Sequence, residues 1–353
     1  MRARLQQVRV RTNGYTVTPE QYVRFAYAGL AALTLIVLTG AAVRLSGSGL
    51  GCPTWPRCYG NVYPPLRTHA LIEFSNRVVT VPVCLAAGLA WLAALRRRPY
   101  RRDLMWLGAA LPLGVVAQAV LGGLTVKGKL DYGWVMGHFA LSMLILVAAV
   151  VLVWRARAAV PGASGPRARA SSEVAGAGEG PVDRTIARGL WGLVALGALT
   201  IFAGTAATAA GPHAGGEPGQ KINRLSFDGR GTMDFVIHRH AEIAFVFSVA
   251  AVALWWLARR RPATAMVRRS LTVLCVLLAV QGAVGLDQYE THLPSELVWV
   301  HVALASAAWL SVLWAACAGA RLSPKPAAQP AERAPERARP AAEALAPLNS
   351  PGN

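Results

Sequence analysis

The sequence predicts an all-α integral membrane protein whose eight transmembrane helices form two repeated four-helix bundles. The first observation is composition: 54% of the 353 residues are hydrophobic and the mean hydropathy is +0.39, which is too apolar for an ordinary soluble domain of this length. The second is a series of apolar runs close to the ~20 residues that a helix needs to cross the hydrocarbon core. The third is an internal repeat that relates the first four runs to the last four.

Eight apolar runs are the predicted transmembrane segments. Proline inside two of them, at Pro82 and Pro112, does not argue against helix, because membrane-spanning helices tolerate proline better than soluble ones. In chain order the runs cover residues 25–44, 76–95, 104–126, 134–154, 187–209, 236–257, 270–288 and 297–318.

Lys and Arg residues are distributed unevenly between the two ends of these runs. If residue 1 is cytoplasmic, 26 of the 36 lie on the cytoplasmic side, which is the excess that the positive-inside rule associates with that side. We therefore expect a multi-pass protein of the cell (plasma) membrane with both termini in the cytoplasm. The formal net charge of +19 follows this pattern, so contact with anionic lipid is expected and nucleic-acid binding is not.

Composition divides the chain into five parts. Two segments are rich in Ala, Pro and charged residues and are typical of chain without a packed core. The predicted order is a cytoplasmic basic arm, an N-terminal bundle, a cytoplasmic linker, a C-terminal bundle and a disordered cytoplasmic tail. These parts cover residues 1–24, 25–155, 156–186, 187–318 and 319–353, respectively.

Short matches in the same order relate the two halves of the chain. The sequence that begins at Gln118 near the end of the third run resembles the one at Gln281 near the end of the seventh. The fourth and eighth runs open on tryptophan followed by histidine, at His138 and His301. Each half has an even number of spans, so the halves run parallel and are related by an axis along the membrane normal.

Three histidines lie at the outer start of an apolar run. His138 and His301 open the fourth and eighth runs and His240 opens the sixth, whereas the matching position in the second run holds Asn76. A single histidine at this depth is ordinarily a hydrogen-bonded group between helices. A repeat-related set favours axial ligation of haem iron, near the extracytoplasmic face. His238 is the alternative to His240, because the two lie on different faces of one helix.

Two of the five cysteines form a pair in the first outer loop. Cys52 and Cys58 lie on the oxidising side of the membrane, where a disulfide is expected. Its role is open between a structural clamp over a haem site and a relay of reducing equivalents. Cys84, Cys275 and Cys317 lie within apolar runs, where we expect small buried hydrophobic residues.

Motifs in the first half carry a family resemblance. The run from Gly40 to Gly60 reads GAAVRLSGSGLGCPTWPRCYG, and the start of the second run reads IEFSNR and contains Glu73. Together with the sequences around Gln118 and His138, they resemble the haem A synthase family, also called CtaA/Cox15, in its actinobacterial-type branch. The similarity covers approximately residues 25–318.

The resemblance implies an oxidoreductase that oxidises the C8 methyl group of haem O to the formyl group of haem A for cytochrome oxidase assembly. It implies a haem b cofactor in the C-terminal bundle, with His240 and His301 as its iron ligands. It implies that the substrate haem O binds in the N-terminal bundle, where Glu73 is the catalytic carboxylate and His138 ligates or positions the substrate.

Two further residues are assigned to the substrate-haem site. Asn76 departs from the usual family pattern, which places histidine there, and asparagine cannot replace imidazole as a strong iron ligand. Bis-histidine ligation of the substrate haem is therefore in doubt. Arg77 carries a planar guanidinium that suits a haem propionate, although a salt bridge to Glu73 one helical turn away is its alternative role.

The resemblance also implies partners. Haem O synthase (protohaem farnesyltransferase) is expected to hand over the substrate, because free haem O is poorly soluble. The electron donor is unknown, and a homo-oligomer is compatible with the sequence. The alternative function is a dihaem b-type membrane cytochrome that transfers electrons without modifying haem, and a haem carrier without turnover is a third hypothesis. The cytochrome gives no reason for Glu73 or for the paired loop cysteines.

Overall fold

Eight long helices dominate the chain that the structure describes. The computed structural model describes residues 15–160, 182–217, 219–227 and 231–319. All but the first residue of the predicted tail, and most of the predicted arm and linker, lie outside these residues. Each helix is long and apolar enough to cross a membrane, which confirms the predicted all-α membrane fold. In chain order they are α1 (Pro19–Leu45), α2 (Thr68–Arg96), α3 (Arg102–Lys127), α4 (Tyr132–Arg157), α6 (Arg184–Ala210), α7 (Thr232–Arg260), α8 (Ala265–Glu290) and α9 (Ser295–Gly319).

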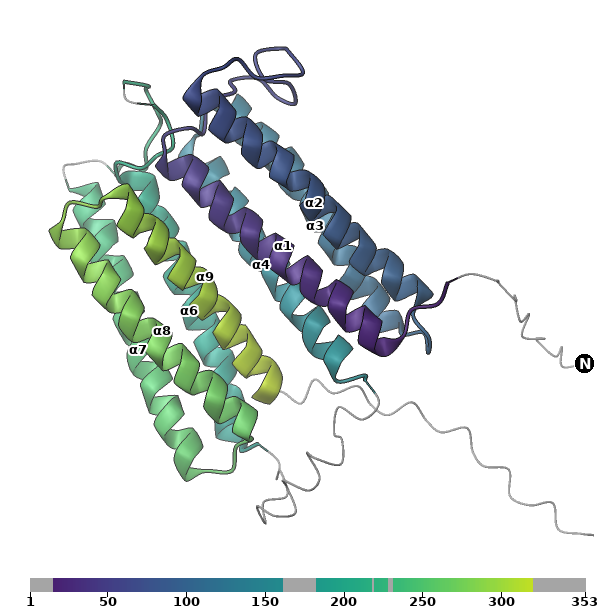
Figure 1. The fold of residues 1–353 in the computed structure, drawn as a ribbon. Coiled ribbons are helices and arrows are strands. Elements are labelled where there is room, and N and C mark those ends of the chain that lie inside the picture. The colour runs from purple at the N-terminus through teal and green to yellow at the C-terminus, as the bar shows by residue number, and fades with distance from the viewer. Residues whose placement is uncertain (1–14, 161–181, 218, 228–230, 320–353) are drawn as a thin grey trace, which may run out of the picture. The chain divides into compact units, whose positions relative to one another are not determined.

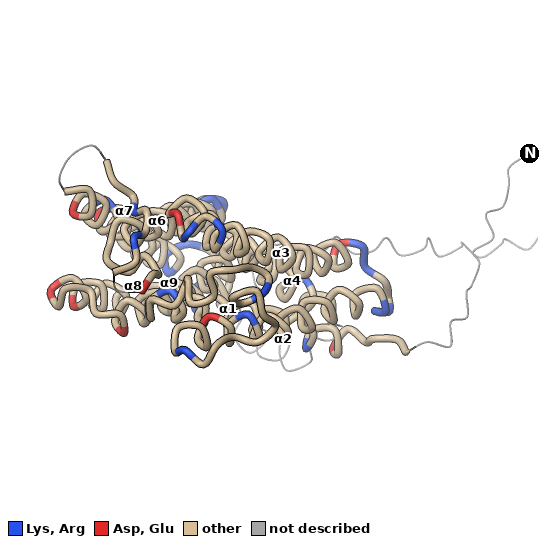
Figure 2. The backbone as a smooth tube through the Cα atoms, turned by 90° about the horizontal axis from the view of Figure 1, so that it is seen from above, with Lys and Arg blue, Asp and Glu red and all other residues tan. Residues whose placement is uncertain are grey.

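Charged residues gather near the ends of these helices. Lys, Arg, Asp and Glu mark helix ends and loops in the tube view, while the central stretches carry none (Figure 2). In α1, for example, no charged residue lies between Arg24 and Arg44. Uncharged stretches of about 20 residues are what the hydrocarbon core of a bilayer accepts. The chain is therefore a multi-pass membrane protein.

The helices form two groups of four, α1–α4 and α6–α9 (Figure 1). The groups meet through α1 and α4 on one side and α6 and α9 on the other. Trp309 on α9 donates its indole N–H to the carbonyl of Met143 on α4 at 3.2 Å, and Trp299 donates to the carbonyl of Leu38 on α1 at 3.0 Å. Buried apolar residues of both groups belong to one continuous core.

Capping residues start several helices before the apolar runs begin. The Thr18 hydroxyl accepts the Gln21 backbone N–H, the Gln21 side chain accepts the Thr18 N–H, and Pro19 is the first helical residue. The Asp183 side chain accepts backbone N–H groups at the start of α6, and the Thr264 hydroxyl accepts one at the start of α8, without a reciprocal bond. As a result α1 begins six residues before the predicted run, and α6 begins inside the predicted linker.

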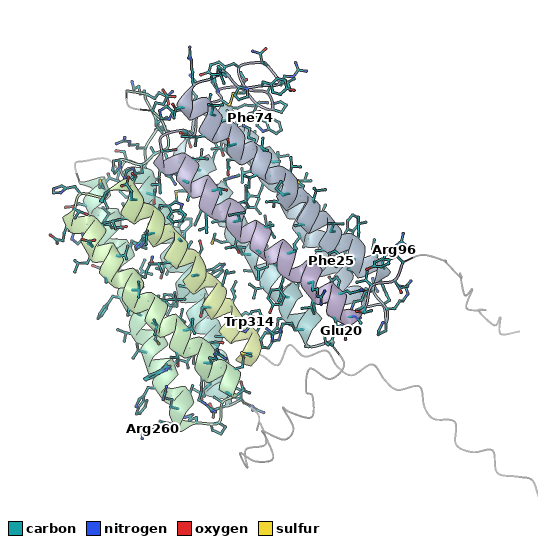
Figure 3. The ribbon with its side chains drawn as sticks, in the orientation of Figure 1. Glu20, Phe25, Phe74, Arg96, Arg260 and Trp314 are labelled. Atoms are coloured by element: carbon teal, nitrogen blue, oxygen red, sulfur yellow. A yellow bond between two sulfur atoms is a disulfide. The ribbon has the colours of Figure 1, made fainter. Side chains whose placement is uncertain are left out.

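The start of α2 differs most from the prediction. The helix begins at Thr68, whereas the apolar run was expected to begin at 76. Hydropathy misses the first two turns because they contain polar residues, although those residues are compatible with helix. His69, which precedes the predicted run, is therefore helical. Phe74 in this segment lies at the end of its bundle that carries the disulfide loop, and Arg96 lies at the opposite end (Figure 3).

The turns after α3 and α8 share an uncommon backbone conformation. Lys129 and Leu130 have φ angles of 52° and 59°, and His292 and Leu293 have φ angles of 64° and 62°. Residues other than glycine seldom adopt this left-handed conformation. In both turns the N–H of the second left-handed residue donates to the carbonyl five residues earlier, at 2.9 and 2.6 Å. The shared geometry supports duplication of one four-helix unit.

The three cysteines of the apolar runs differ in their exposure. Cys317 is buried and Cys275 is half-buried, in line with the expectation of small core residues, but Cys84 is exposed. The expectation was wrong for Cys84 because an apolar residue on a membrane helix is stable against lipid and need not be covered by protein.

Candidate functional site

The imidazoles of His240 and His301 lie next to each other between α7 and α9. Their ring centroids are 6.2 Å apart, and the ring planes make an angle of 69°. Bonds from a metal to an imidazole nitrogen are ~2 Å long, so two imidazoles on opposite sides of one iron place their centroids roughly 6 Å apart. The angle between the planes is not restrictive, because each ring can rotate about its bond to the metal. The spacing therefore fits a shared haem iron.

Backbone contacts orient these two rings. Nδ1 of His240 donates to the carbonyl of Thr200 on α6 at 3.1 Å, which leaves Nε2 for a metal. A Cβ atom at Gly204 would lie 3.0 Å from Cε1 of His240, and one at Gly285 would lie 3.2 Å from Cε1 of His301. Glycine at both positions thus lets each ring approach the neighbouring helix closely.

His238 lies away from this pair. Its side chain is exposed, its Nδ1 donates to the carbonyl of Asp234 at 2.7 Å, and its ring lies 6.4 Å from that of Tyr289. Of the two candidates on α7, the structure brings His240 and not His238 next to His301.

The N-terminal bundle repeats the surroundings of His301 around His138. The Gln118 side chain donates to the carbonyl of His138 at 2.9 Å, as Gln281 does to the carbonyl of His301 at 3.1 Å. A Cβ atom at Gly122 would lie 3.3 Å from Cε1 of His138, close to the 3.2 Å found in the other half. His138 with Gln118 and Gly122, and His301 with Gln281 and Gly285, are therefore two copies of one arrangement, which we call the repeated frame.

Asn76 occupies the place of His240 in the first copy. Gly40 on α1 packs towards Asn76 as Gly204 on α6 packs towards His240. The contact is looser, because a Cβ atom at Gly40 would lie 4.0 Å from Nδ2 of Asn76. The first copy thus presents one imidazole and one amide where the second presents two imidazoles.

Unpaired polar atoms cluster around these two places. Buried side-chain nitrogen and oxygen atoms are nearly always hydrogen-bonded in proteins, and exceptions often mark bound groups. Among the described residues, nine such atoms have no hydrogen-bond partner, and five belong to residues of the two repeated arrangements. The five are Oδ1 of Asn76, Oε1 of Gln118, Nδ1 of His138, Oε1 of Gln281 and Nδ1 of His301. Together with the imidazole spacing, they fit sites that hold a polar prosthetic group.

Glu73 on α2 is buried, and each of its two carboxylate oxygens accepts a hydrogen bond. Only 6% of the residue is exposed. Its Oε2 accepts the backbone N–H of Cys52 at 2.7 Å, and its Oε1 pairs with Nη2 of Arg77 at 2.5 Å. Hydrogen bonds from a cation and a backbone amide hold the carboxyl group in one orientation. The salt bridge expected as the alternative role of Arg77 is thus present, while the catalytic role of Glu73 stays a prediction.

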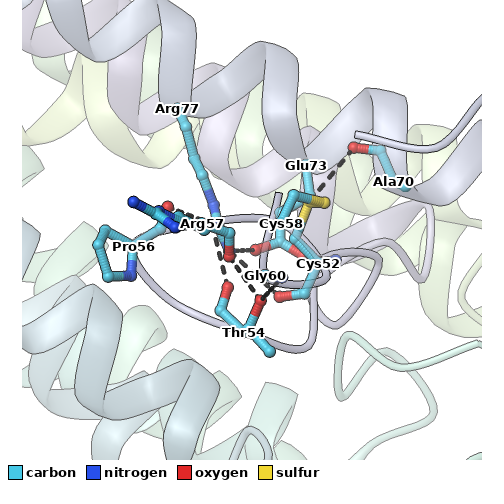
Figure 4. Close-up of a disulfide and its surroundings, with 9 residues drawn as sticks. All are labelled: Cys52, Thr54, Pro56, Arg57, Cys58, Gly60, Ala70, Glu73 and Arg77. Atoms are coloured by element: carbon cyan, nitrogen blue, oxygen red, sulfur yellow. Dashed lines mark hydrogen bonds and ion pairs between the residues drawn. A yellow bond between two sulfur atoms is a disulfide. The ribbon is translucent and has the colours of Figure 1, made fainter. Parts of the chain in front are cut away.

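Arg77 also fastens the first outer loop to α2. Cys52 and Cys58 form the expected disulfide, and both are fully buried. Besides Glu73, the two terminal nitrogens of Arg77 donate to the carbonyls of Cys52, Thr54 and Pro56, each at 3.2 Å (Figure 4). All the N–H groups on these two nitrogens are therefore in use. The structure gives Arg77 a role in holding the loop, whereas its assignment to the substrate-haem site stays a prediction.

Hydrogen bonds between the two halves were not foreseen from the sequence. Nε of Arg44 at the end of α1 donates to the carbonyl of His213 at 3.0 Å, and its Nη2 donates to the carbonyl of Thr208 at 3.4 Å. Nε2 of His213 in turn donates to the carbonyl of Leu293 at 2.7 Å. The signal that could have found this link is a guanidinium in the last turn of an apolar helix, which needs partners of its own.

Comparisons with known proteins identify relatives over most of the chain. The model of the family COX15-CtaA, described as cytochrome oxidase assembly protein, matches residues 23–313. A protein named Heme A synthase from Symbiobacterium thermophilum is 30% identical over 266 residues, which is 73% of this chain and 82% of that protein. Another protein of that name, from Lysinibacillus sphaericus, is 34% identical over 131 residues, 36% of this chain and 42% of that protein.

One similar protein carries a different name. A protein from Thermus thermophilus named Protoheme IX farnesyltransferase is 28% identical over 303 residues. The alignment covers 81% of this chain but only 46% of that protein. This chain thus matches less than half of both the Lysinibacillus and the Thermus relatives, and most of the Symbiobacterium one.

Proposed function

The chain belongs to the COX15-CtaA family of cytochrome oxidase assembly proteins, and from this premise we propose that it is a haem A synthase. Several relatives carry the name Heme A synthase, among them one that aligns with 73% of the chain. The proposed reaction is the oxidation of the C8 methyl group of haem O to the formyl group of haem A.

The proposed reaction sets the chemical requirements of the site. With water as the oxygen source, R–CH3 + H2O gives R–CHO + 4 H+ + 4 e−, so both electrons and protons must leave the substrate. Protein side chains do not carry out such oxidations alone. A haem b cofactor, when bound, supplies a route for the electrons to an acceptor. The chain's own residues must bind both haems and move the protons.

The adjacent imidazoles of His240 and His301 are the observation that carries the proposal. Their 6.2 Å centroid separation suits a resident haem b, and the hydrogen bond from His240 to Thr200 fixes which imidazole nitrogen is free. His240 and His301 would hold the haem between them, and the haem would supply electron transfer there.

The N-terminal bundle is the proposed substrate site, with His138 as the residue that ligates or positions haem O. Glu73 is the proposed catalytic carboxylate. A carboxylate has about four lone-pair sites, so the bonds from Cys52 and Arg77 leave it capacity to accept a further proton or to stabilise positive charge at the reacting carbon. The same bonds hold it in one orientation.

Pigment analysis tests this function. Full-length protein purified from cells that supply haem O is expected to contain haem b and newly formed haem A. Glu73→Gln should abolish haem A formation and leave the haem b spectrum unchanged. The matched control is Glu242→Gln, which removes a carboxylate from the exposed ion pair with Arg239 on α7. Haem A formation by Glu73→Gln, or its absence in the unaltered protein, would contradict the proposal.

We also propose the membrane location of the enzyme, its orientation and its substrate donor. We place it in the plasma membrane with both termini in the cytoplasm and both haem sites near the extracytoplasmic face, because of the Lys and Arg distribution. Haem O synthase is the proposed substrate donor, because free haem O is poorly soluble. The alternative of an electron-transferring dihaem cytochrome has no support among the named relatives.

A further inference from the structure

The two repeated frames differ at one position that decides how many protein ligands an iron can have. We propose that the substrate haem is ligated by His138 on one face only, and that its opposite axial position takes a small exchangeable ligand beside the Asn76 amide. The inference rests on the proposed function, because it concerns the haem that the N-terminal bundle binds as substrate.

The repeat fixes where the open position lies. His138 has the same glutamine and glycine contacts as His301, so its imidazole has the same place relative to the bundle. Asn76 on α2 corresponds to His240 on α7. Gly40 packs towards Asn76, as Gly204 packs towards His240. A haem ligated by His138 therefore turns its other face towards Asn76.

Asparagine at this place cannot close the coordination shell. Its neutral amide is a poor ligand for haem iron, and its side chain is shorter than that of histidine. A Cβ atom at Gly40 would lie 4.0 Å from the amide, against 3.0 Å from Gly204 to the imidazole, so α1 packs less tightly on Asn76 than α6 does on His240. The amide therefore ends short of the place that an imidazole would reach, and a small ligand would take the place between the amide and the iron.

The amide is also equipped to bind such a molecule. Oδ1 of Asn76 is buried and has no hydrogen-bond partner among the described residues, so the side chain is not explained as a polar link between helices. Its charged neighbours do not satisfy it, because Glu73 and Arg77 direct their side-chain bonds to each other and to the disulfide loop. An amide offers both a donor and an acceptor. The ligand class is thus a small neutral molecule such as water, dioxygen or carbon monoxide.

Carbon monoxide is the probe that distinguishes an open from a closed iron. Full-length protein carrying haem b and haem O or haem A is reduced and exposed to carbon monoxide, and the Soret spectrum and the C–O stretching band are recorded. The spectrum of the substrate haem should shift, and that of haem b should not. Asn76→Leu should keep carbon monoxide binding but raise the C–O stretching frequency, because a hydrogen-bond donor to the bound molecule is lost.

Exchanging the two residues between the halves provides matched variants. Asn76→His should abolish carbon monoxide binding and convert the substrate haem to a low-spin spectrum like that of haem b. His240→Asn should do the reverse, so that haem b gains carbon monoxide binding. If His240→Asn lowers haem retention, the Asn76→His variant still tests the proposal, because it adds a ligand and removes none.

The outcomes separate this inference from the function. A substrate haem that is low-spin and inert to carbon monoxide in the unaltered protein, with haem A still formed, overturns the inference and leaves the function standing. An N-terminal bundle that retains no haem overturns both. An unchanged C–O frequency in Asn76→Leu overturns the role given to the amide.

Discussion

The two halves of the molecule share one scaffold but differ in the chemistry attached to it. In both halves a histidine lies near the start of the fourth helix. A glutamine of the third helix donates a hydrogen bond to the histidine carbonyl, and a glycine of the third helix packs against the ring. Only the first half adds a buried carboxylate, an arginine clamp and a disulfide loop, and it replaces the second imidazole with Asn76. In the proposed function, the scaffold determines where a haem binds, and the added groups determine whether that haem is retained or altered.

The matching positions on α7 make this difference concrete. The alignment that pairs Asn76 with His240 pairs Glu73 with Ile237 and Arg77 with Ala241. The second half therefore has neither the carboxylate nor the cation at those places. A duplicated bundle without them is suited to hold a cofactor, whereas the bundle that has them is suited to act on a substrate.

Removing an imidazole from the second half is expected to have the largest effect. His301→Ala should abolish the low-spin haem b spectrum, because one of two proposed iron ligands is lost. His238→Ala is the matched control on the same bundle and should keep the spectrum, since its side chain is exposed and bonded to Asp234. Visible spectroscopy of the purified proteins measures both. An unchanged spectrum in His301→Ala would exclude it as a ligand.

Removing the Arg77 guanidinium, which we call the clamp because it bonds both Glu73 and the loop carbonyls, should have the next largest effect. Arg77→Ala leaves Glu73 without its ion pair and frees three loop carbonyls, so the misplaced carboxylate should lower haem A formation ~100-fold. The haem b spectrum should not change. Arg77→Lys should recover only part of the activity, because a single ammonium cannot make the bonds of a guanidinium fork.

The control for the clamp is Arg239→Ala, which removes an arginine from the exposed pair with Glu242. Surface ion pairs contribute little, so this variant should keep full activity. Equal activity of Arg77→Ala and the unaltered protein would show that the loop holds Glu73 without the arginine.

The smallest expected effect compares the two glycines behind the site. A Cβ atom at Gly204 would lie 3.0 Å from His240, so Gly204→Ala must displace the ring, and overpacking of this kind costs about 1 kcal/mol or more. We expect a few-fold loss of haem b occupancy. Gly40→Ala meets Asn76 only at 4.0 Å and should be tolerated, as measured by haem content per protein. Equal losses in both would mean that the frames are packed alike.

The sequence predicted the helices better than it predicted the contacts that complete the site. Apolar runs and the repeated Gln118 and Gln281 motifs identified eight helices in two groups, because hydropathy and repetition are local signals. Hydropathy could not place the first turns of α2, where Thr68, His69 and Glu73 are polar but helical. The clamp on the loop carbonyls depends on how the loop folds back over α2, and no local pattern encodes that.

The hydrogen bonds of Arg44 bear on the order in which the protein matures. Its two acceptors lie 164 and 169 residues later in the chain, so a ribosome completes the first quartet well before it makes them. Until then a guanidinium in the last turn of a membrane-spanning helix lacks these partners, which is an unfavourable state. The first quartet therefore reaches its final form only after α6 has been inserted, and a nascent chain that stalls earlier exposes a feature that membrane quality-control proteases can detect.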